Sequence, residues 1–378
     1  MKPSGARVDV SFVMAAYSMG GMELQLAALL RNRPEWARGL RLEVITLLPS
    51  ASAEVEGQFL DLGVEATTID RSKLSFPKFL SRLVGHMKRT RPHIVHTQLD
   101  ASAGTWGRLA ALLAGADAVI QSDLSLMVGG TPVQRRLRRF LDARTTLFLP
   151  NATAIRDRLV STGVRQEKIN VLMPGVDLSR FDYRSVPARL DSDAGLIAGF
   201  LGRFDPVKRL DVLLEALKLL PHDVRPAKVL LAGDGPTRPE VERLIAADPW
   251  LTTHCELVGR QKDVPAYLRR LDYLIHPSEI EGLPNAVLEA MAMARPIVAT
   301  RVSDVPMIVA DAGFLANPAD AVSLASAIRK MQDQSVEERL RLGALARSKI
   351  ERDHDLVEVS RRFWDAHAAV APIRVGLA

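Results

Sequence analysis

The sequence predicts an α/β protein made of two Rossmann-like, doubly wound domains. Its 378 residues suffice for two domains of ordinary size, each with its own core. Short apolar segments alternate with amphipathic helical patterns in both halves, which is typical of parallel sheets covered by helices. An apolar content of 47% with 25% charged residues argues against wholesale disorder.

We expect five buried strands in each half, joined by helices. They cover residues 8–15, 42–47, 94–97, 118–121 and 147–149 in the first half, and residues 196–201, 228–232, 254–258, 273–276 and 297–299 in the second. A polar, Pro-containing stretch predicts a linker near residues 182–195. The expected parts are an N-terminal domain (1–182), a C-terminal domain (183–350) and a C-terminal helix (351–378) that packs back on the N-terminal domain.

The composition indicates the cellular compartment of the protein and the charge of its partners. Cys255 is the only cysteine, which excludes an internal disulfide and fits a reducing cytosol. No apolar run of about 18 residues occurs, so no membrane-spanning helix is expected. The first 183 residues hold 24 Lys and Arg against 17 Asp and Glu, whereas the rest hold 26 against 27. This asymmetry indicates an anionic partner for the first half only.

The segment HPSEIEGLPNAVLEAMAMARPIVAT is the most informative in the chain. It places Glu281 before a helix predicted over residues 285–294 and Glu289 about one turn inside that helix. The first amides of a helix are unpaired donors at the positive end of its dipole. Two carboxylates beside such a helix start suit a sugar nucleotide, because its diphosphate binds amides and its ribose and sugar hydroxyls donate to carboxylates. A solvated Glu at each end of an amphipathic helix is the alternative.

Three further motifs lie at predicted strand-to-helix turns, where anions bind in open α/β sheets. In FLGRFDPVKRL, Arg203 and Lys208 bracket such a turn and supply two cations for a diphosphate. In VLLAGDGPTR, Gly235 lets the backbone approach a ligand closely, and Gly20 with Gly21 does the same after the first strand. Each turn alone also fits a plain connector, so it is their combination that indicates a ligand.

Together these motifs resemble the retaining GT-B glycosyltransferases of family 4, the glycosyl transferases group 1 type. The resemblance covers nearly the whole chain and is strongest over residues 196–300. It implies two Rossmann-like domains that face a central cleft, the first binding the acceptor and the second the nucleotide sugar. It also implies transfer with retention of configuration, in which the departing phosphate accepts the proton of the acceptor.

The family motifs are carried over residue by residue. EGLPNAVLEAMA matches the paired-Glu motif, which implies that Glu281 contacts the donor sugar and Glu289 the ribose. The cations that the family uses for the diphosphate correspond to Arg203 and Lys208. The other donor-binding positions that the resemblance implies are Gly20, Gly21, Gly235, Arg260, Gly282, Leu283, Pro284 and Asn285.

The chain departs from the family on the acceptor side. Many members have a histidine at the end of the fourth strand, close to the reaction centre, and Asp123 stands near that position here. We therefore expect Asp123 to be the acceptor-side catalytic group. His96, in HIVHTQ, is more simply explained as a hydrogen-bonded histidine at a strand end.

The expected function is transfer of a hexose from a nucleotide sugar to a saccharide or lipid-linked acceptor, in the synthesis of cell-surface polysaccharide or glycolipid. A UDP- or GDP-sugar is favoured as the donor, and no further cofactor is expected. No metal is expected, because no His/Cys cluster with ligand spacing occurs. Two alternatives stay open: a GT-B phosphorylase or epimerase, and a catalytically silent protein that binds nucleotide sugars.

Two basic amphipathic segments of the first half predict peripheral contact with an anionic membrane. One is KFLSRLVGHMKRTRP, and the other, PVQRRLRRFLDAR, contains Arg135, Arg136, Arg138, Arg139 and Arg144. A solvated helix face explains the same pattern. The expected location is the cytoplasm, at the inner face of the inner membrane. Nucleic acid is not expected as a partner, since aromatic residues make up only 5% of the chain and no recognised binding motif occurs.

Overall fold

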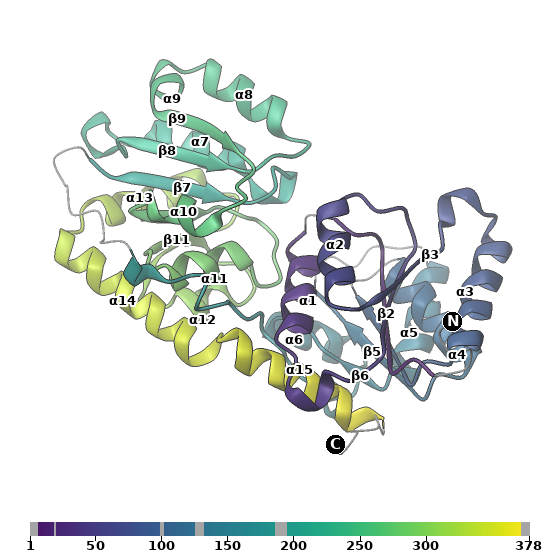
Figure 1. Ribbon diagram of the computed structural model, residues 1–378. Helices are drawn as coiled ribbons and strands as arrows, with labels where there is room; N and C mark the ends of the chain where they lie inside the picture. The colour runs from purple at the N-terminus through teal and green to yellow at the C-terminus, as the bar shows by residue number, and fades with distance from the viewer. Residues whose placement is uncertain (1–6, 19, 99–101, 125–131, 186–194, 372–378) are drawn as a thin grey trace. The chain divides into compact units, whose positions relative to one another are not determined.

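Two six-stranded parallel sheets form the centre of the structure, a computed structural model that describes residues 7–18, 20–98, 102–124, 132–185 and 195–371 (Figure 1). Each sheet belongs to one compact unit. Unit 1 comprises Met1–Gly175 and Leu356–Ala378, and unit 2 comprises Val176–Asp355. The predicted α/β class with two doubly wound domains is confirmed.

The sheet of unit 1 has the strand order β3-β2-β1-β4-β5-β6. Its order reverses between β1 and β4, and such a switch point is where open α/β sheets bind ligands. The strands are β1 (Val10–Met14), β2 (Leu42–Thr46), β3 (Glu65–Thr68), β4 (Ile94–Gln98), β5 (Ala118–Ser122) and β6 (Leu147–Phe148).

Helices cover both faces of this sheet. Apolar side chains of α1 (Gly21–Arg31), α2 (Ala53–Asp61) and α15 (Leu356–Val370) form one buried cluster with β1 and β2. Those of α3 (Phe76–Thr90) and α4 (Arg108–Ala114) form a second cluster with other residues of the same strands. Unit 1 also contains α5 (Pro132–Arg144) and α6 (Thr153–Ser161).

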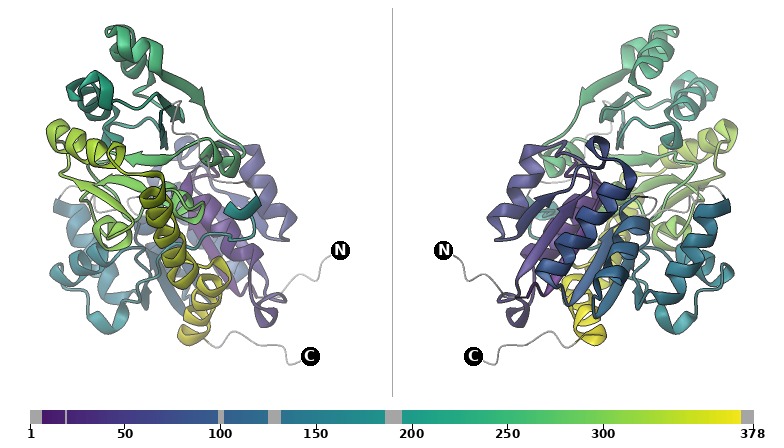
Figure 2. Two further views of the ribbon diagram at one scale, coloured as in Figure 1. Left: turned by 90° about the vertical axis from the view of Figure 1, so that its left-hand side faces the viewer. Right: turned by 90° about the vertical axis from the view of Figure 1, so that its right-hand side faces the viewer.

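The C-terminal helix α15 packs on unit 1 although it follows unit 2 in sequence (Figures 1 and 2). Ser360 Oγ and Trp364 Nε1 donate hydrogen bonds to the carbonyl of Leu29 in α1, at 2.9 and 3.3 Å. Trp364 is fully buried, and its ring packs edge-on against Phe12 of β1. Helix α15 is therefore part of the core of unit 1.

Two buried histidines connect α15 to the sheet. His367 Nδ1 donates to the carbonyl of Phe363 at 2.7 Å, so its Nε2 accepts from His96 Nδ1 at 3.0 Å. His96 Nε2 in turn accepts from Ser122 Oγ at 2.8 Å, which confirms His96 as a hydrogen-bonded histidine, although it lies in the middle of β4 and not at its end. This series of hydrogen bonds requires that the imidazole rings of both His96 and His367 are neutral. Burial lowers the pKa of His367 to about 4 and the pKa of His96 well below its usual range.

We expect the stability of unit 1 to fall as the pH drops from about 6.5 to 4. The unfolded chain protonates His367 with its ordinary pKa of 6.5, whereas the folded unit keeps the ring neutral down to a pKa of about 4. Protons therefore favour unfolding between these values, by about 3 kcal/mol in total. Urea unfolding followed by tryptophan fluorescence measures this loss, because Trp364 packs against His367.

The matched control is the exposed His222 of unit 2. His367→Gln should flatten the pH dependence of the free energy of unfolding, whereas His222→Gln should leave it unchanged. The same slope in wild type and His367→Gln would contradict the assignment.

The sheet of unit 2 has the equivalent order, β12-β11-β10-β7-β8-β9, with its switch point between β7 and β10. The strands are β7 (Ile197–Leu201), β8 (Lys228–Ala232), β9 (Cys255–Gly259), β10 (Tyr273–His276), β11 (Ile297–Thr300) and β12 (Gly313–Ala316). The helices are α7 (Leu210–Leu219), α8 (Arg238–Ala246), α9 (Pro249–His254), α10 (Val264–Arg269), α11 (Asn285–Ala292), α12 (Val305–Val309), α13 (Ala321–Gln332) and α14 (Val336–Asp353).

All ten predicted strands occur, with ends that shift by no more than two residues. The sequence analysis missed β3 and β12, each of which is one of the two edge strands of its sheet. Strand β3 is polar and alternates between half-buried and exposed residues, and β12 is short and begins with glycine. Neither therefore has the continuous apolar run of a central parallel strand.

The chain crosses between the units at Gly175 and Asp355, rather than at the predicted residues 182 and 351. The amide of Val176 donates to the carbonyl of His354 at 2.7 Å, so the first residues after the crossing pair with the last residues before the return. Most of the predicted linker, residues 186–194, lies outside the described residues. None of the helices in the described part of the chain has the length and apolar character that crossing a membrane requires.

Candidate functional site

The predicted donor-binding residues of unit 2 gather at the carboxyl end of its sheet. Strand β10 ends at His276 and α11 begins at Asn285, and the loop between them carries Glu281. The neighbouring strand β7 leads into a short 3₁₀ turn, Pro206–Lys208. The amide of Glu279 donates to the carbonyl of Val207 at 2.8 Å, so the backbone holds the two loops together. These loops lie at the switch point of the sheet.

Three side chains from these loops form a buried polar cluster. Lys208 Nζ pairs with Glu281 Oε1, and the same oxygen lies 3.0 Å from His276 Nε2. The side chains of Lys208 and Glu281 are 18% and 13% exposed, and that of His276 is 1% exposed. We call Lys208, Glu281 and His276 the donor-site cluster. Neither the ammonium nor the carboxylate is a freely solvated charge.

The surroundings keep Glu281 ionised and His276 neutral. Burial opposes ionisation of Glu281, but its hydrogen bond to His276 and the charge of Lys208 outweigh it and hold the pKa of this carboxyl well below its usual range. Burial lowers the pKa of His276, although Glu281 opposes the shift. The neutral ring therefore donates from Nε2 to Glu281. Its Nδ1 is buried and has no hydrogen-bond partner among the described residues.

Glu289 occupies a different environment, inside α11. Within the described residues no hydrogen bond or ion pair reaches its partly buried carboxyl group. Burial raises the pKa of Glu289 to about 7, and the charge of Arg180 opposes this shift only in part. A carboxyl group with this environment gains from an external hydrogen-bond donor, such as a hydroxyl of a ligand.

Arg203 does not join the donor-site cluster. Its side chain is 71% exposed and pairs with the carboxylate of Asp205. Asp205 also caps the 3₁₀ turn, since its Oδ1 accepts from the amide of Val207 at 3.4 Å. Of the two predicted diphosphate cations, the structure brings only Lys208 to Glu281.

The glycine-rich turn after β8 packs directly against the loop after β7. A Cβ at Gly233 would overlap with the carbonyl oxygen of Gly202, and one at Gly235 would overlap with that of Phe204. Both positions have φ values, 146° and 159°, that side chains rarely adopt. Close packing of this turn against the loop after β7 therefore accounts for both glycines. Arg260 lies beside it, with its Nε 3.9 Å from Asp234 Oδ2 and its side chain 65% exposed.

The remaining predicted donor-binding positions fall at two helix starts. Gly282, Leu283 and Pro284 are buried before α11, with Asn285 as its first residue. In unit 1, Gly20 is the N-cap of α1 and Gly21 its first residue.

The glycine before α1 makes room for a buried carboxyl group. A Cβ at Gly20 would overlap with Glu23 Oε2, while Ser18 Oγ donates to Glu23 Oε1 at 2.6 Å. Burial raises the pKa of Glu23, although the Ser18 hydrogen bond opposes the shift. The sequence GGME therefore places an acidic side chain directly over the glycine turn.

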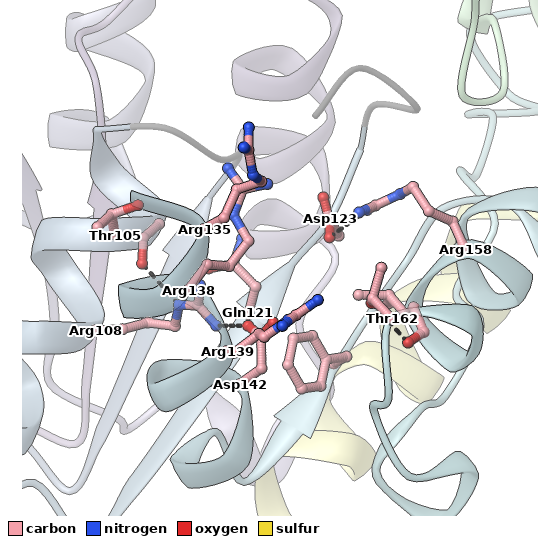
Figure 3. Close-up of a pocket in the computed structure, with 13 residues that line it drawn as sticks. Thr105, Arg108, Gln121, Asp123, Arg135, Arg138, Arg139, Asp142, Arg158 and Thr162 are labelled. Carbon is pink, nitrogen blue, oxygen red and sulfur yellow. Dashed lines mark hydrogen bonds and ion pairs between the residues drawn. The ribbon is translucent and has the colours of Figure 1, made fainter. Parts of the chain in front are cut away.

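Asp123 follows β5 in unit 1 and is held by an ion pair. Its Oδ2 accepts from Arg158 Nη2 at 2.6 Å, and the two side chains are 13% and 17% exposed. Asp123 lines a cavity of about 120 Å³ (Figure 3). The residues around this arginine pocket are Gly104, Thr105, Arg108, Gln121, Asp123, Arg135, Arg138, Arg139, Asp142, Phe148, Arg158, Leu159 and Thr162.

Sequence reasoning missed His276, Arg108 and Arg158. The signal for His276 was its place as the last strand residue before Pro-Ser, directly upstream of the paired-Glu motif. Arg108 and Arg158 lie in helices without a recognisable motif, so only the fold brings them to Asp142 and Asp123. No group of three or more His, Cys, Asp or Glu side chains in the described ranges is arranged to hold a metal ion.

Known families match both units. Residues 19–180 match the family described as Glycosyltransferase Family 4, and residues 195–334 match Glycosyl transferases group 1. The amylovoran biosynthesis glycosyltransferase AmsK of Erwinia amylovora is 28% identical over 221 residues, which is 56% of this chain and 53% of that protein. The chain thus spans about half the length of this relative.

A second relative is the UDP-Gal:alpha-D-GlcNAc-diphosphoundecaprenol alpha-1,3-galactosyltransferase of Escherichia coli. It is 26% identical over 277 residues, which is 68% of this chain and 71% of that protein.

Solved structures share the fold at low sequence identity. Anabaena HepE in complex with UDP has a TM-score of 0.78 and 19% identity, over 96% of this chain and 100% of that chain. Sucrose-phosphate synthase from Thermosynechococcus elongatus has a TM-score of 0.75 and 17% identity, over 96% and 99%. With both family matches and this fold, the chain belongs to the GT-B glycosyltransferases of family 4 and group 1.

Proposed function

We propose that the protein transfers a hexose from a nucleotide sugar to a saccharide or lipid-linked acceptor, with retention of configuration, in the synthesis of a cell-surface polysaccharide or glycolipid. The observation that carries this proposal is the donor-site cluster of Lys208, Glu281 and His276. A buried ammonium beside an ionised carboxylate, at the carboxyl end of a parallel sheet, suits a diphosphate next to a sugar hydroxyl. The names of the amylovoran and diphosphoundecaprenol relatives point in the same direction.

In the proposed reaction each group has one task. Lys208 stabilises the negative charge that develops on the departing nucleoside diphosphate, together with the first amides of α11. Glu281 accepts a hydrogen bond from a hydroxyl of the transferred sugar, and His276 keeps its carboxylate oriented. The bond from the anomeric carbon to the diphosphate breaks, the acceptor oxygen bonds to the same face of that carbon, and the acceptor proton passes to the departing phosphate.

The donor that we propose is a UDP- or GDP-sugar. The carboxyl group of Glu289, without an internal partner, would accept the ribose hydroxyls. A uridine nucleotide is favoured by the relative named for UDP-Gal and by the complex of HepE with UDP. We propose no additional cofactor and no metal, because Lys208 and the first amides of α11 offer the positive charge that a diphosphate needs. The proposed location is the cytoplasm.

Lys208→Gln should lower kcat by about two orders of magnitude. A positive charge that is held beside the departing diphosphate contributes about 3 kcal/mol to transition-state stabilisation. Glu281→Gln should cause a loss of similar size. The measurement is release of nucleoside diphosphate from common nucleotide sugars in excess EDTA, with the anomer of the product assigned by NMR. Lys218→Gln, which removes an exposed lysine of unit 2, is the matched control.

A catalytically silent binding protein gives a different result. It would bind a nucleotide sugar without releasing nucleoside diphosphate under any condition. An inverted product would reject the retaining mechanism, and activity that EDTA abolishes would reject the metal-independent one. If no common nucleotide sugar binds at all, the proposed function is wrong.

Affinity for the nucleotide sugar should weaken about tenfold between pH 8 and pH 6. Glu289, whose pKa is about 7, is mostly ionised at pH 8 and mostly protonated at pH 6, and only the ionised form accepts both ribose hydroxyls. Binding then lowers the pKa of Glu289, so protons are released near pH 6.5. Calorimetry in buffers of different ionisation enthalpy measures this release. Glu289→Gln should abolish it; an unchanged release in this variant would assign the proton to another group.

We also propose that unit 1 contacts an anionic membrane through its basic helices, at the cytoplasmic face of the inner membrane. On α3, Lys78 and Arg82 are exposed, and so is Phe76 at the start of the helix. The ring of Phe76 packs against Trp106 at a centroid distance of 4.7 Å. Exposed cations beside an aromatic pair suit the interface of an anionic bilayer.

The double variant Lys78→Gln/Arg82→Gln should bind vesicles rich in phosphatidylglycerol at least about tenfold more weakly, since each basic residue near such a surface contributes about 1 kcal/mol. Sedimentation with vesicles measures this, and rising salt should weaken the binding of the wild type. The control is Lys218→Gln/Arg329→Gln, which removes two exposed cations of unit 2. Binding that neither salt nor the α3 variant changes would reject the contact.

A further inference from the structure

Two consecutive cations connect the loop after β7 to the loop before α11. Lys208 pairs with Glu281 in the donor-site cluster, and Arg209 Nη1 lies 2.7 Å from Glu279 Oε2. The amide of Glu279 also donates to the carbonyl of Val207 at 2.8 Å. Two ion pairs and one backbone hydrogen bond thus hold a short stretch of each loop against the other.

The two ion pairs lie on different sides of these loops. Arg209, Asp211 and Glu279 line a cavity of about 360 Å³, whereas neither Lys208 nor Glu281 lines it. The side chains of Arg209 and Glu279 are 26% and 44% exposed, so this outer pair is partly solvated, in contrast to the more deeply buried pair of the donor-site cluster. The outer pair is therefore a neighbour of the cluster and not a member of it.

The backbone of Arg209 adopts a left-handed conformation, with φ and ψ angles of 49° and 48°. Side chains other than glycine rarely adopt these angles, because the Cβ atom comes too close to the backbone. Arg209 lies at the junction where the 3₁₀ turn Pro206–Lys208 ends and α7 begins. An arginine is strained at this junction, so what compensates the strain must come from its side chain.

The guanidinium group of Arg209 bonds to two carboxylates at once. Its Nε and Nη2 donate to Asp211 in the first turn of α7, at 2.9 to 3.3 Å, and its Nη1 donates to Glu279 at 2.7 Å. Both carboxylates favour the charged guanidinium and raise the pKa of Arg209. A planar group with donors on two edges holds both partners in a fixed geometry. Most residues of α7 are buried in the core of unit 2, so Arg209 fixes the loop before α11 to a rigid helix.

We propose that Arg209 is a positioning residue for the sugar transfer, and that its bond to Glu279 fixes the geometry of the donor-site cluster; the part that concerns the reaction rests on the proposed function. Arg209 directly follows Lys208, and Glu279 lies two residues before Glu281. A movement of the outer pair is therefore transmitted to the inner one. Because Lys208 stabilises charge that develops in the transition state, its misplacement lowers kcat more than it weakens binding of the nucleotide sugar.

The variant that tests this role is Arg209→Gly, which removes both outer bonds and also relieves the left-handed backbone. These two changes have opposite effects on the free energy of unfolding, so the urea midpoint of the whole chain should change little. The matched control is Arg91→Gly. Arg91 is an exposed arginine that follows α3 in unit 1 and has a φ of 47°, so the control makes the same chemical change at another left-handed position.

Release of nucleoside diphosphate from the nucleotide sugar with the highest rate measures the effect on the reaction. Arg209→Gly should lower kcat about tenfold and change the KM of the nucleotide sugar less than about twofold. In a Lys208→Gln background the same substitution should cause no further loss, because Arg209 acts through the cluster. Glu279→Gln should reproduce the loss, and Arg209→Gly/Glu279→Gln should lose no more than either single variant. Arg91→Gly should change neither kcat nor KM.

Amide hydrogen exchange of the whole chain, followed by mass spectrometry, tests the positioning without any reaction. The amides of residues 277–284 should exchange about threefold faster or more in Arg209→Gly than in the wild type, whereas those of the unit 2 sheet should stay protected. Glu279 is 70 positions away from Arg209 in the sequence, so a change limited to the substituted turn would not reach this loop. Arg91→Gly should leave the exchange of residues 277–284 unchanged.

Two results would overturn the assignment. One is an exchange rate of residues 277–284 that Arg209→Gly does not change. The other is a loss of kcat that is as large in the Lys208→Gln background as in the wild type, because Arg209 would then act on the fold as a whole rather than on the cluster.

The same measurements separate this inference from the proposed function. If the wild type releases no nucleoside diphosphate from any nucleotide sugar, the transferase is wrong, and the exchange of residues 277–284 decides whether Arg209 holds the loop. If Lys208→Gln loses activity while Arg209→Gly keeps both its kcat and the protection of this loop, the transferase stands and the positioning role is wrong.

Discussion

The ion pair between Lys208 and Glu281 is the interaction on which the site of unit 2 depends. It joins the loop after β7 to the loop before α11, and His276 at the end of β10 fixes the carboxylate from a third side. Burying two charges costs free energy that their attraction offsets only when the geometry is good and the other hydrogen bonds are made. Removing either partner leaves the other charge buried and unpaired, which lowers the free energy of unfolding by about 3–5 kcal/mol. The stability of such a variant must therefore be measured beside its activity, to separate a loss of fold from a loss of catalysis.

The two carboxyl groups of the paired-Glu motif lie eight positions apart in the sequence, and their pKa values are shifted in opposite directions. Glu281 has a cation and a ring N–H beside it, so its pKa falls in spite of burial. For Glu289 only the charge of Arg180 opposes the effect of burial, so burial dominates and the pKa of this carboxyl group rises to about 7. One motif therefore supplies a permanently ionised acceptor and a second acceptor whose charge depends on pH.

Much of this organisation could be predicted from the sequence, because it follows from local patterns. Central parallel strands are continuous apolar runs, and Gly235 and Pro284 mark turns at their ends, so ten strands and the start of α11 were predicted correctly. The pairing of Arg203 with Asp205 rather than with the cluster could not be predicted, since spacing does not say which way an exposed side chain turns. Arg158 was missed because its partner Asp123 is set by a tertiary contact alone, whereas His276 lies five residues before Glu281 and could have been found from its place at the end of the strand.

The alternation of side chains along β5 explains why one strand end serves two purposes in unit 1. Successive residues of a strand point to opposite faces of the sheet. Ser122 turns to the face covered by α15 and closes the histidine chain through His96, whereas Gln121 and Asp123 turn to the opposite face and line the arginine pocket. A shift of one residue would exchange these faces, so the hydrogen bonds that dock α15 also fix which residues the pocket receives. Docking of the C-terminal helix and the chemistry of the pocket are thus linked through the register of a single strand.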